Sequence, residues 1–510
     1  MRFLSRMTDA SPQFLSRLEG LRRYVPLAAW AMVILVILAI PFKILSYGYL
    51  PADDALRHAA YAVSGKTWPE ILVLGPTYHF DPNWGWHWFL RQFHRAFHWD
   101  AGALVIFEVA FLFCVAQGAI AACFKRPEAW LAAFVLVVLI SDLTSRFLLG
   151  RPFLLSVTAL GVILLVWQRH GETPPPWWYC FWLTPLLALA VFLHGVWYLW
   201  VLPLAAFFLA RQFRWFVLLG ISWVAGTWIG SALTGHPLAS ILQAIELALN
   251  AVGMQTVQLT LVGELKPSGG EIWPVAFVGG LIALRRLAGL NAPPLARHPA
   301  FWLAALGWLL GCQTFRFWED WGAPALMVLM AGDLQLWFQQ QFAFDSFKRL
   351  GLIAATVLAM WAVTTNDVGS RWTNALSWRF LSQNDPELKG WLPGKGGIFY
   401  AADSEFFFQT FFKNPTADWR YALGFESTLM TPDNFKTWQN ILWNFGDAKA
   451  YRPWVEKMRP QDRLVIVGAA GAKPDIPQLE WNRPVGSYWI GRLPLTNAAP
   501  ATLPPPRSAR

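Results

Sequence analysis

Eleven segments of the chain are long and mostly apolar, and this feature limits its fold more than any other. A helix needs about 20 such residues to cross a bilayer. The segments lie at residues 26–47, 101–123, 128–149, 153–168, 178–194, 196–210, 215–233, 271–284, 300–315, 321–337 and 350–365. The composition agrees, since 14% of the residues are charged, against about 25% in ordinary soluble domains. We therefore predict a multi-spanning α-helical membrane protein with about eleven transmembrane helices.

Positive charge predicts the orientation of these helices, because Lys and Arg accumulate in cytoplasmic loops. With the N-terminus in the cytoplasm, every predicted inner loop is basic. These loops carry Lys125 and Arg126, Arg169, Arg211 and Arg214, Arg285 and Arg286, and Lys348 and Arg349. Residues 48–100, residues 234–270 and everything after about residue 366 then lie outside. Topology largely explains the net charge of +10, which gives no reason to expect a nucleic-acid partner.

Tryptophan is abundant, and many of the 32 residues lie at predicted span ends. Trp is typical of the belt where membrane and water meet, and we expect most of these residues to belong to it. They include Trp86, Trp88, Trp99, Trp197, Trp200, Trp318 and Trp321. Some outer tryptophans could instead stack on a sugar ring, and composition does not separate the two roles.

The long apolar segments end at about Thr365, and the sequence after it predicts a small α/β domain. Strands are predicted at residues 396–402, 418–425, 463–468 and 486–493, and helices at 404–414, capped by Ser404, and 431–445. The predicted domains are thus a transmembrane domain at residues 1–365, an extracytoplasmic domain at 366–496 and a disordered, proline-rich tail at 497–510. The second domain carries no phosphate loop or nucleophile motif, so we expect an accessory role.

Two adjacent carboxylates stand just past the first apolar segment, in the stretch LPADDALRHAAYAVSG. Pro51 ends the first span, and Asp53 or Asp54 can cap a new helix along the membrane surface, with Leu56, Ala59, Ala60 and Val63 on one side. Capping alone would explain an isolated Asp. Five of the nine histidines share this loop, however, and favour a functional role for the pair.

The run HWFLRQFHRAFH in the same loop predicts an interfacial helix with a cationic face. His87, Arg91, His94 and His98 fall on one helical stripe, and Phe89, Leu90, Phe93 and Phe97 on the other side. Such a face can attract anionic lipid or hold the phosphate of a lipid-linked substrate. A metal site begun by His94 and His98 with Asp81 or Asp100 is a weaker alternative.

Further ionisable residues lie in or beside the apolar segments, where they are costly and mark functional candidates. Most lie near predicted outer ends. They are Arg146, Arg151, His194, Arg316 and Glu319, with Glu108 inside a span. A mutual ion pair among Arg316, Glu319 and Asp320 is the structural alternative. His194 is followed by a glycine, which would permit a substrate or backbone to approach closely.

This layout resembles the GT-C superfamily of membrane glycosyltransferases. The likeness consists of a cytoplasmic N-terminus, one anchor span, a long first outer loop with an acidic pair near its start, many further spans and an outer C-terminal α/β domain. The resemblance implies transfer of a sugar from a polyprenyl-phosphate or polyprenyl-diphosphate carrier to a glycan, lipid or protein acceptor on the extracytoplasmic face. It also implies that a carboxylate of the first outer loop is catalytic, sometimes with a divalent cation.

On this interpretation Asp54 and Asp53 are the catalytic residues, with Asp54 favoured because Asp53 is better placed as the helix cap. The expected substrate-binding residues are Arg57, His58, Arg91, His94, Arg146, Arg151, His194, Arg316 and Glu319. No metal ligands are assigned and no cofactor is certain, with a divalent cation left open. A lipid-linked saccharide flippase or other transporter is the alternative from another class, and a polysaccharide polymerase or ligase would share the same site chemistry. We expect a bacterial inner-membrane location.

Overall fold

The computed structural model describes residues 20–139, 143–171, 173–253, 272–467, 473–485 and 488–494. The predicted disordered tail at 497–510 lies outside them. The chain forms two compact units. The helical unit comprises Met1–Ala62 and His79–Ser377, and the C-terminal unit comprises Val63–Tyr78 and Trp378–Arg510. The C-terminal unit therefore takes one segment from the middle of the first predicted outer loop.

Each predicted apolar segment carries a helix in the part of the chain that the structure describes. Five helices are long and apolar enough to cross a membrane: Gly20–Ser46, whose main part is α2 (Val25–Ser46), α6 (Ala101–Ala122), α9 (Phe153–His170), α12 (Phe213–Ala232) and α18 (Phe347–Thr365). The others are α7 (Pro127–Val138), α8 (Leu143–Phe147), α10 (Cys180–Leu193), α11 (Val201–Leu209), α13 (Pro237–Gly253), α14 (Trp273–Leu287), α15 (Pro299–Gly311), α16 (Phe315–Phe317) and α17 (Ala323–Gln341). The number of spans remains a prediction beyond these five.

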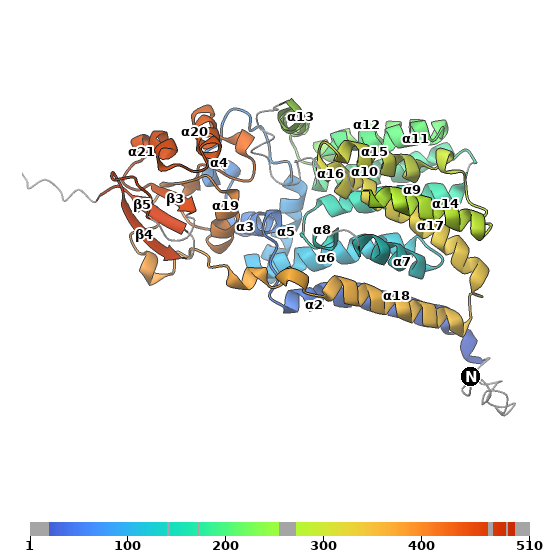
Figure 1. Ribbon diagram of the computed structural model, residues 1–510. Coiled ribbons are helices and arrows are strands. Elements are labelled where there is room, and N and C mark those ends of the chain that lie inside the picture. Colours follow the sequence, from blue (N-terminus) through green and yellow to red (C-terminus); the bar gives the residue numbers. More distant parts are fainter. Residues whose placement is uncertain are drawn as a thin grey trace, which may run out of the picture. The chain divides into compact units, whose positions relative to one another are not determined.

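The helices pack in pairs that are mostly distant in sequence (Figure 1). α18 lies along α2, α7 packs on α17, α6 on α9, and α10 on α12. The last pair approaches closely because α12 presents glycines. A Cβ at Gly230 would lie 2.5 Å from the carbonyl oxygen of Ala188 in α10. Small residues let apolar helices pack with their backbones close together.

Two arginines of the helical unit are paired with buried carboxylates on neighbouring helices. Arg349 of α18 donates to both carboxylate oxygens of Glu128 in α7, at 2.7 and 3.1 Å, and both side chains are fully buried. Arg285 of α14 makes the same two-bond contact with Asp333 of α17, at 2.7 and 3.0 Å. Arg349 is thus an interhelical contact, whereas the sequence suggested an inner-loop charge. The charge of the buried Asp333 is thus balanced by Arg285.

Four tryptophans assigned to the membrane belt are buried inside the protein. Trp86, Trp200, Trp318 and Trp321 are each at most 5% exposed, and Trp200 packs edge-on against Trp321 with ring centroids 5.5 Å apart. Trp88, in contrast, is about half exposed. The belt prediction is therefore wrong for the four buried residues, because position near a span end does not reveal which way a ring points.

The C-terminal unit contains a five-stranded sheet in the order β2-β1-β3-β5-β4. The strands are β1 (Ile398–Ala401), β2 (Arg420–Tyr421), β3 (Arg463–Val467), β4 (Glu480–Val485) and β5 (Tyr488–Arg492). β1 pairs parallel with β2 and β3, placing Tyr400 opposite Leu464, while β5 runs antiparallel to β3 and β4. This confirms a small α/β fold, and β4 is a strand that the sequence pattern did not indicate.

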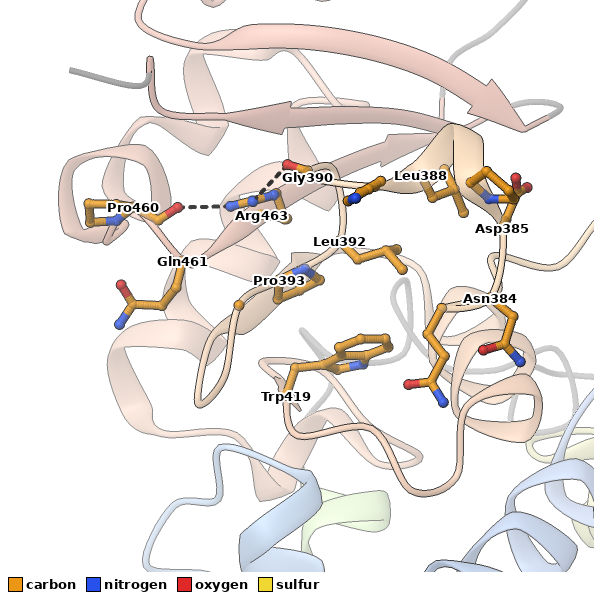
Figure 2. A pocket seen from close by; sticks show the side chains of 14 residues that line it. Asn384, Asp385, Leu388, Gly390, Leu392, Pro393, Trp419, Pro460, Gln461 and Arg463 are labelled. Carbon is orange, nitrogen blue, oxygen red and sulfur yellow. Dashed lines mark hydrogen bonds between the residues drawn. The ribbon is translucent and has the colours of Figure 1, made fainter. Parts of the chain in front are cut away.

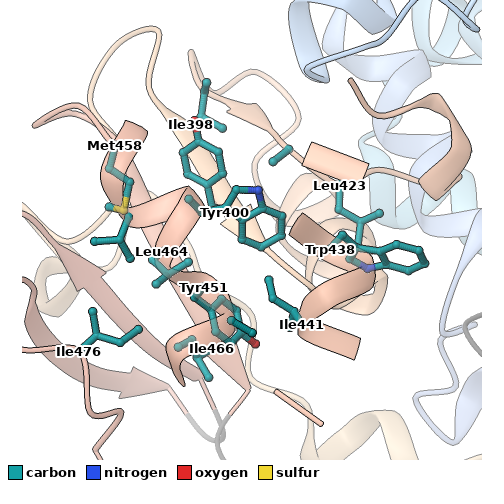
Figure 3. Close-up of a cluster of buried hydrophobic side chains, with 14 of the residues drawn as sticks. Ile398, Tyr400, Leu423, Trp438, Ile441, Tyr451, Met458, Leu464, Ile466 and Ile476 are labelled. Atoms are coloured by element: carbon teal, nitrogen blue, oxygen red, sulfur yellow. The ribbon is translucent and has the colours of Figure 1, made fainter. Parts of the chain in front are cut away.

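Helices cover both faces of this sheet. Successive strand residues point to opposite sides, so neighbouring residues of β1 contact different helices. Phe399 contacts Phe406 of α19 (Ser404–Lys413), with ring centroids 5.1 Å apart. The next residue, Tyr400, contacts Trp454 of α21 (Arg452–Lys457), with ring centroids 5.7 Å apart. The core on the Tyr400 side also includes Leu464, Ile466 and residues of α20 (Pro432–Trp443) (Figure 3).

Two local features of this unit differ from the predictions. Asp403 caps α19 by accepting from the backbone N–H of Glu405 at 2.9 Å, so the predicted cap at Ser404 is one residue late. The segment Val63–Tyr78 contributes α4 (Trp68–Ile71), and Leu72 forms an isolated parallel bridge with Tyr421. The first predicted outer loop therefore serves both units.

Candidate functional site

The first loop contributes two helices, α3 (Asp54–Ser64) and α5 (Trp84–Phe97), close to the predicted positions. The environment of α3 differs from the prediction. Every residue from Ala55 to Ala62 is buried, including Arg57 and His58. α3 is therefore an interior helix carrying polar groups on its buried surface, and the predicted surface helix with one apolar side is wrong.

Asp53 and Asp54 are both held by arginines. Arg151 donates from Nε to Asp53 Oδ1 at 3.1 Å and from Nη2 to Asp53 Oδ2. Arg57 donates from Nε to Asp54 Oδ1 at 2.6 Å, and Arg151 Nε lies 3.5 Å from Asp54 Oδ2. The Asp53 side chain thus binds Arg151 rather than capping α3, which removes the earlier reason for preferring Asp54. The freer oxygen of the pair is Asp54 Oδ2.

A tight turn before α9 brings Arg151 to these carboxylates. Gly150 has a φ of +67°, which glycine adopts without strain. A Cβ at Gly150 would lie 3.0 Å from the Ala55 Cβ and 3.2 Å from Val109 Cγ2. The turn therefore packs directly on α3 and α6, and glycine is needed both for its conformation and for this close approach.

The two arginines also control the ionisation of Asp54. Burial by itself would raise the pKa of this carboxyl, but the charges of Arg57 and Arg151 and the hydrogen bond from Arg57 outweigh it and hold the pKa well below the usual range. Asp54 is thus ionised at neutral pH. Such a carboxylate is well suited to orienting a hydroxyl group, while its low basicity limits it as a proton acceptor.

A chain of hydrogen bonds runs beside the acidic pair. Asp81 Oδ2 lies 2.5 Å from His87 Nδ1 of α5, and His87 Nε2 lies 2.7 Å from His58 Nδ1 of α3. All three side chains are buried, and the backbone N–H of Asn83 donates to Asp81 Oδ1 at 3.0 Å. Asp81 was predicted only as an alternative metal ligand, although an Asp before Pro-Asn is typical of a side chain that binds its own turn.

The ionisation states along this chain are consistent. The bonds from His87 and the Asn83 N–H outweigh the effect of burial and lower the pKa of Asp81, which is thus a carboxylate. Burial lowers the pKa of His87 despite Asp81, and burial together with Arg57 lowers that of His58 further. Both imidazoles are therefore neutral at pH 7.

A second charged cluster lies at the start of α17. Arg146 of α8 donates to Asp320 Oδ1 from Nε at 3.0 Å and from Nη2 at 2.7 Å, and Arg316 Nε donates to Asp320 Oδ2 at 3.0 Å. Glu319 lies 3.6 Å from Arg146. The ion pair weighed for Arg316 therefore exists, with Arg146 as an additional member. Asp320 and Glu319 belong to a π-helical turn, Trp318–Gly322, a distortion frequent at functional sites.

His194 links the two clusters. It follows α10, its Nδ1 lies 3.3 Å from Ser156 Oγ of α9, and it is within electrostatic range of Arg316, Asp54, Arg146 and Arg151. The backbone N–H of Gly195 donates to the Pro82 carbonyl at 3.0 Å. A Cβ on residue 195 would lie 2.6 Å from the same oxygen, so the close approach requires glycine.

Most of the predicted site residues lie in the two charged clusters, at His194 between them in electrostatic range, or at His58 beside the acidic pair. They are Asp53, Asp54, Arg57, His58, Arg146, Arg151, His194, Arg316 and Glu319. Ser156 is an addition that local sequence signals did not single out. Asp320 had been considered only as an ion-pair partner, His87 as part of a cationic stripe and Asp81 as a metal ligand.

Arg91 and His94, both predicted to bind phosphate, each contact a neighbour within the protein. The Arg91 guanidinium lies 5.5 Å from the Tyr61 ring centre, and His94 Nδ1 donates to the Trp99 carbonyl at 2.7 Å, just past the end of α5. His87 and Leu90 are both buried, although the prediction placed them on opposite sides of the helix. The continuous cationic stripe is therefore wrong.

The acidic pair is poorly arranged for a divalent cation. Both oxygens of Asp53 bind Arg151, and Asp54 Oδ1 binds Arg57. Among the described residues no group of three or more His, Cys, Asp or Glu side chains is placed to hold a metal ion. Guanidinium groups balance the charge of the carboxylates at this site.

The C-terminal unit has a cavity of about 800 Å³ between its loops. Figure 2 shows Trp419, Asn384 and Gln461 around it. Arg463 in its wall donates to the backbone carbonyls of Pro460 and Gly390 at 2.9 and 3.0 Å. This guanidinium thus holds the surrounding loops together.

Comparison with known proteins adds little. No family model and no curated protein matches the chain. A crystal structure of the Archaeoglobus fulgidus oligosaccharyltransferase, tethered with an acceptor peptide, is similar over 88% of this chain and 70% of its own, at 12% identity and a TM-score of 0.48. A likeness of this size carries no argument about activity.

Proposed function

We propose that the chain is a membrane glycosyltransferase. It transfers a sugar from a polyprenyl-phosphate or polyprenyl-diphosphate carrier to an acceptor on the extracytoplasmic face, in cell-envelope glycan or lipid modification. The observation that carries this proposal is the acidic pair held by Arg151 and Arg57, with His194 and a second arginine cluster within electrostatic range.

The arginines suit the departure of a lipid phosphate. When the bond between the sugar and the phosphate breaks, negative charge develops on the phosphate oxygens, and fixed cations nearby stabilise that charge. Arg316 is about a third exposed at its side chain, whereas Arg146 is nearly buried. Arg316 is therefore the cation that a phosphate can reach more readily, and Arg146 holds Asp320 in place beside it.

Asp54 suits the acceptor side of the reaction. Within the described part of the chain its Oδ2 has only the longer 3.5 Å contact with Arg151, so this oxygen can accept a hydrogen bond from an incoming hydroxyl. Asp53 has both oxygens engaged by the Arg151 guanidinium and serves to fix that side chain. Asp54 is thus the preferred acceptor-orienting residue, for a reason different from helix capping.

Transport of a lipid-linked saccharide is the second candidate, and the ion pairs weigh against it. A transport pathway requires ionisable groups that face a passage through the membrane. Asp333 is instead bound by Arg285, and Glu108 accepts from the Trp86 indole N–H at 3.2 Å. A polymerase or ligase differs from the first proposal in its acceptor alone. The proposed location is a bacterial inner membrane, with the N-terminus cytoplasmic.

The test is transfer of radiolabelled sugar from a panel of polyprenyl-phosphate and polyprenyl-diphosphate donors by the purified protein in lipid. Wild type is compared with Asp53→Asn and Asp54→Asn, and Glu456→Gln on the exposed surface of α21 is the matched control. Loss of transfer with Asp54→Asn, retained donor binding and an active control would support the proposal. If no donor is consumed, or if both aspartate variants are fully active, the glycosyltransferase proposal is wrong.

A further inference from the structure

The buried Asp81–His87–His58 chain has no part in holding the acidic pair. It joins the turn before α5 to α5 and α3, and it ends on His58, one helical turn after Asp54. Buried polar groups usually satisfy each other in closed networks. No hydrogen bond reaches Nε2 of His58 from any residue that the structure describes. The chain is therefore open at its His58 end.

The direction of the hydrogen bonds follows from chemistry. A carboxylate only accepts, so Nδ1 of His87 carries the hydrogen that Asp81 binds. Neutral His87 then has a lone pair on Nε2, which accepts from the Nδ1–H of His58. Neutral His58 in turn has its lone pair on Nε2. The sequence of donors and acceptors thus makes the open end a proton acceptor.

We propose that His58 accepts the proton of the acceptor hydroxyl during sugar transfer, with His87 and Asp81 as positioning residues. This rests on the proposed function. As the hydroxyl oxygen forms its bond to the anomeric carbon, its proton moves to His58 Nε2. The bond from that carbon to the carrier phosphate breaks, and the phosphate leaves with the electron pair. The imidazolium then returns its proton to water after product release.

The surrounding charges support a division of labour between Asp54 and His58. Arg57 and Arg151 neutralise Asp54, leaving it an orienting group of low basicity. A neutral imidazole is the stronger base, and general-base catalysis contributes about 10²- to 10⁴-fold.

The imidazolium that forms on His58 has several charged neighbours. Arg57 and Arg151 oppose it, while Asp54 favours it. Asp81 stabilises it through His87, against the opposing charge of Arg91 near His87. The carboxylates on both sides thus reduce the opposing effect of the arginines as the proton arrives, while burial and Arg57 still hold the pKa of His58 below its ordinary value.

One test of this inference needs no substrate. Solid-state NMR of protein labelled with ¹⁵N-histidine in lipid bilayers distinguishes the ring tautomers, with His58→Gln and His87→Gln identifying the signals. At pH 7 both residues should be neutral with the hydrogen on Nδ1. A hydrogen on Nε2 of His58, or a charged His58 ring, would overturn the inference.

The second test is kinetic, with the donor found in the panel. His58→Gln should lower kcat by about 10²-fold or more with an unchanged donor KM. In His58→Ala, added imidazole should restore transfer in proportion to its neutral form, an effect that a purely structural role would not produce. His79→Gln, a half-exposed histidine of the same loop, is the control.

The pH profile separates positioning from packing. Wild-type kcat should fall only on acidification well below pH 6.5, because burial and Arg57 lower the pKa of His58 below that ordinary value and protonated His58 cannot accept a proton. Asp81→Asn should lower kcat and move this fall to lower pH, since its charge raises the pKa of His87. Full activity of His58→Gln, or a failure of imidazole to rescue His58→Ala that is folded by size exclusion, would refute the role. If wild type consumes no donor, the proton-transfer role fails together with the proposed function, while the NMR result stands by itself.

Discussion

Replacing Arg151 is the sharpest perturbation of the acidic pair, because one guanidinium contacts both carboxylates. Arg151→Met removes the charge and both hydrogen bonds to Asp53. Arg151→Lys keeps the charge and loses the planar two-bond geometry, which an ammonium group cannot reproduce. Comparing the two variants separates charge from geometry.

The expected size of the effect follows from the contacts. A hydrogen bond to a charged group contributes about 1.5–3 kcal/mol, and Arg151 makes two of them with Asp53. The Asp53 and Asp54 side chains are 23% and 27% exposed. Water can therefore solvate these carboxylates when the arginine is removed, which reduces the energetic cost of losing the hydrogen bonds. We therefore expect Arg151→Met to raise the barrier to transfer by about 2–3 kcal/mol, or about 30- to 150-fold in kcat. Arg151→Lys should lose less.

The assay is the sugar-transfer reaction with single and double variants. In a cycle with Asp53→Asn, the double variant should be little worse than the poorer single one, giving a coupling energy above about 1 kcal/mol. Arg169→Met, at the opposite end of α9, is the control. Additive losses, or unchanged kcat in Arg151→Met, would refute the idea that Arg151 acts by fixing Asp53.

Three further predictions concern stability, the close approach at the turn and pH. Glu128→Gln should destabilise the protein by about 3–5 kcal/mol in denaturant titrations, because it strands the buried Arg349, and adding Arg349→Met should recover most of the loss; an unaffected single variant would contradict this. Gly150→Ala should lower both melting temperature and transfer, since its Cβ would press on Ala55; wild-type values would show that the turn can shift. Because Asp54 has a lowered pKa, its ion pairs stabilise the fold above its ordinary pKa of 3.8, and this stabilisation disappears as the pH falls through the lower folded value. The melting-temperature difference between wild type and Asp54→Asn should thus stay constant from pH 5 to 8 and shrink below pH 3.8, and a difference that changes near neutrality would argue against the lowered pKa.

The sequence predicted the helices well because lipid requires long apolar runs whose backbone bonds are satisfied internally. The expected span 101–123 is nearly coincident with α6, Ala101–Ala122. Strands were harder, since β4 lacks a clear alternation and gains its place by pairing with β5. Local pattern also missed that Val63–Tyr78 joins the C-terminal unit, because that choice depends on contacts with Tyr421, far along the chain.

The site was predictable in its residue types and less so in its pairings. The ionisable residues predicted near apolar segments are each held by a charged or polar partner, because such a group is costly without one in these surroundings. Which partner each one finds depends on tertiary structure. Asp53 binds Arg151, 98 positions away, and nothing local distinguishes this arrangement from helix capping. The stripe on α5 failed for the same reason, since a helical wheel describes a lone helix, and burial is decided by what packs against it.

The division of the first loop between two units has a consequence for evolution and for protein engineering. A C-terminal unit inherited as a single cassette from Trp378 onward would lack α4 and the bridge between Leu72 and Tyr421. Successful exchange of this unit between related chains therefore requires coordinated replacement of two segments, one of which begins only nine residues after Asp54. Recombination in this chain is constrained next to its acidic pair, and the two regions are expected to diverge together.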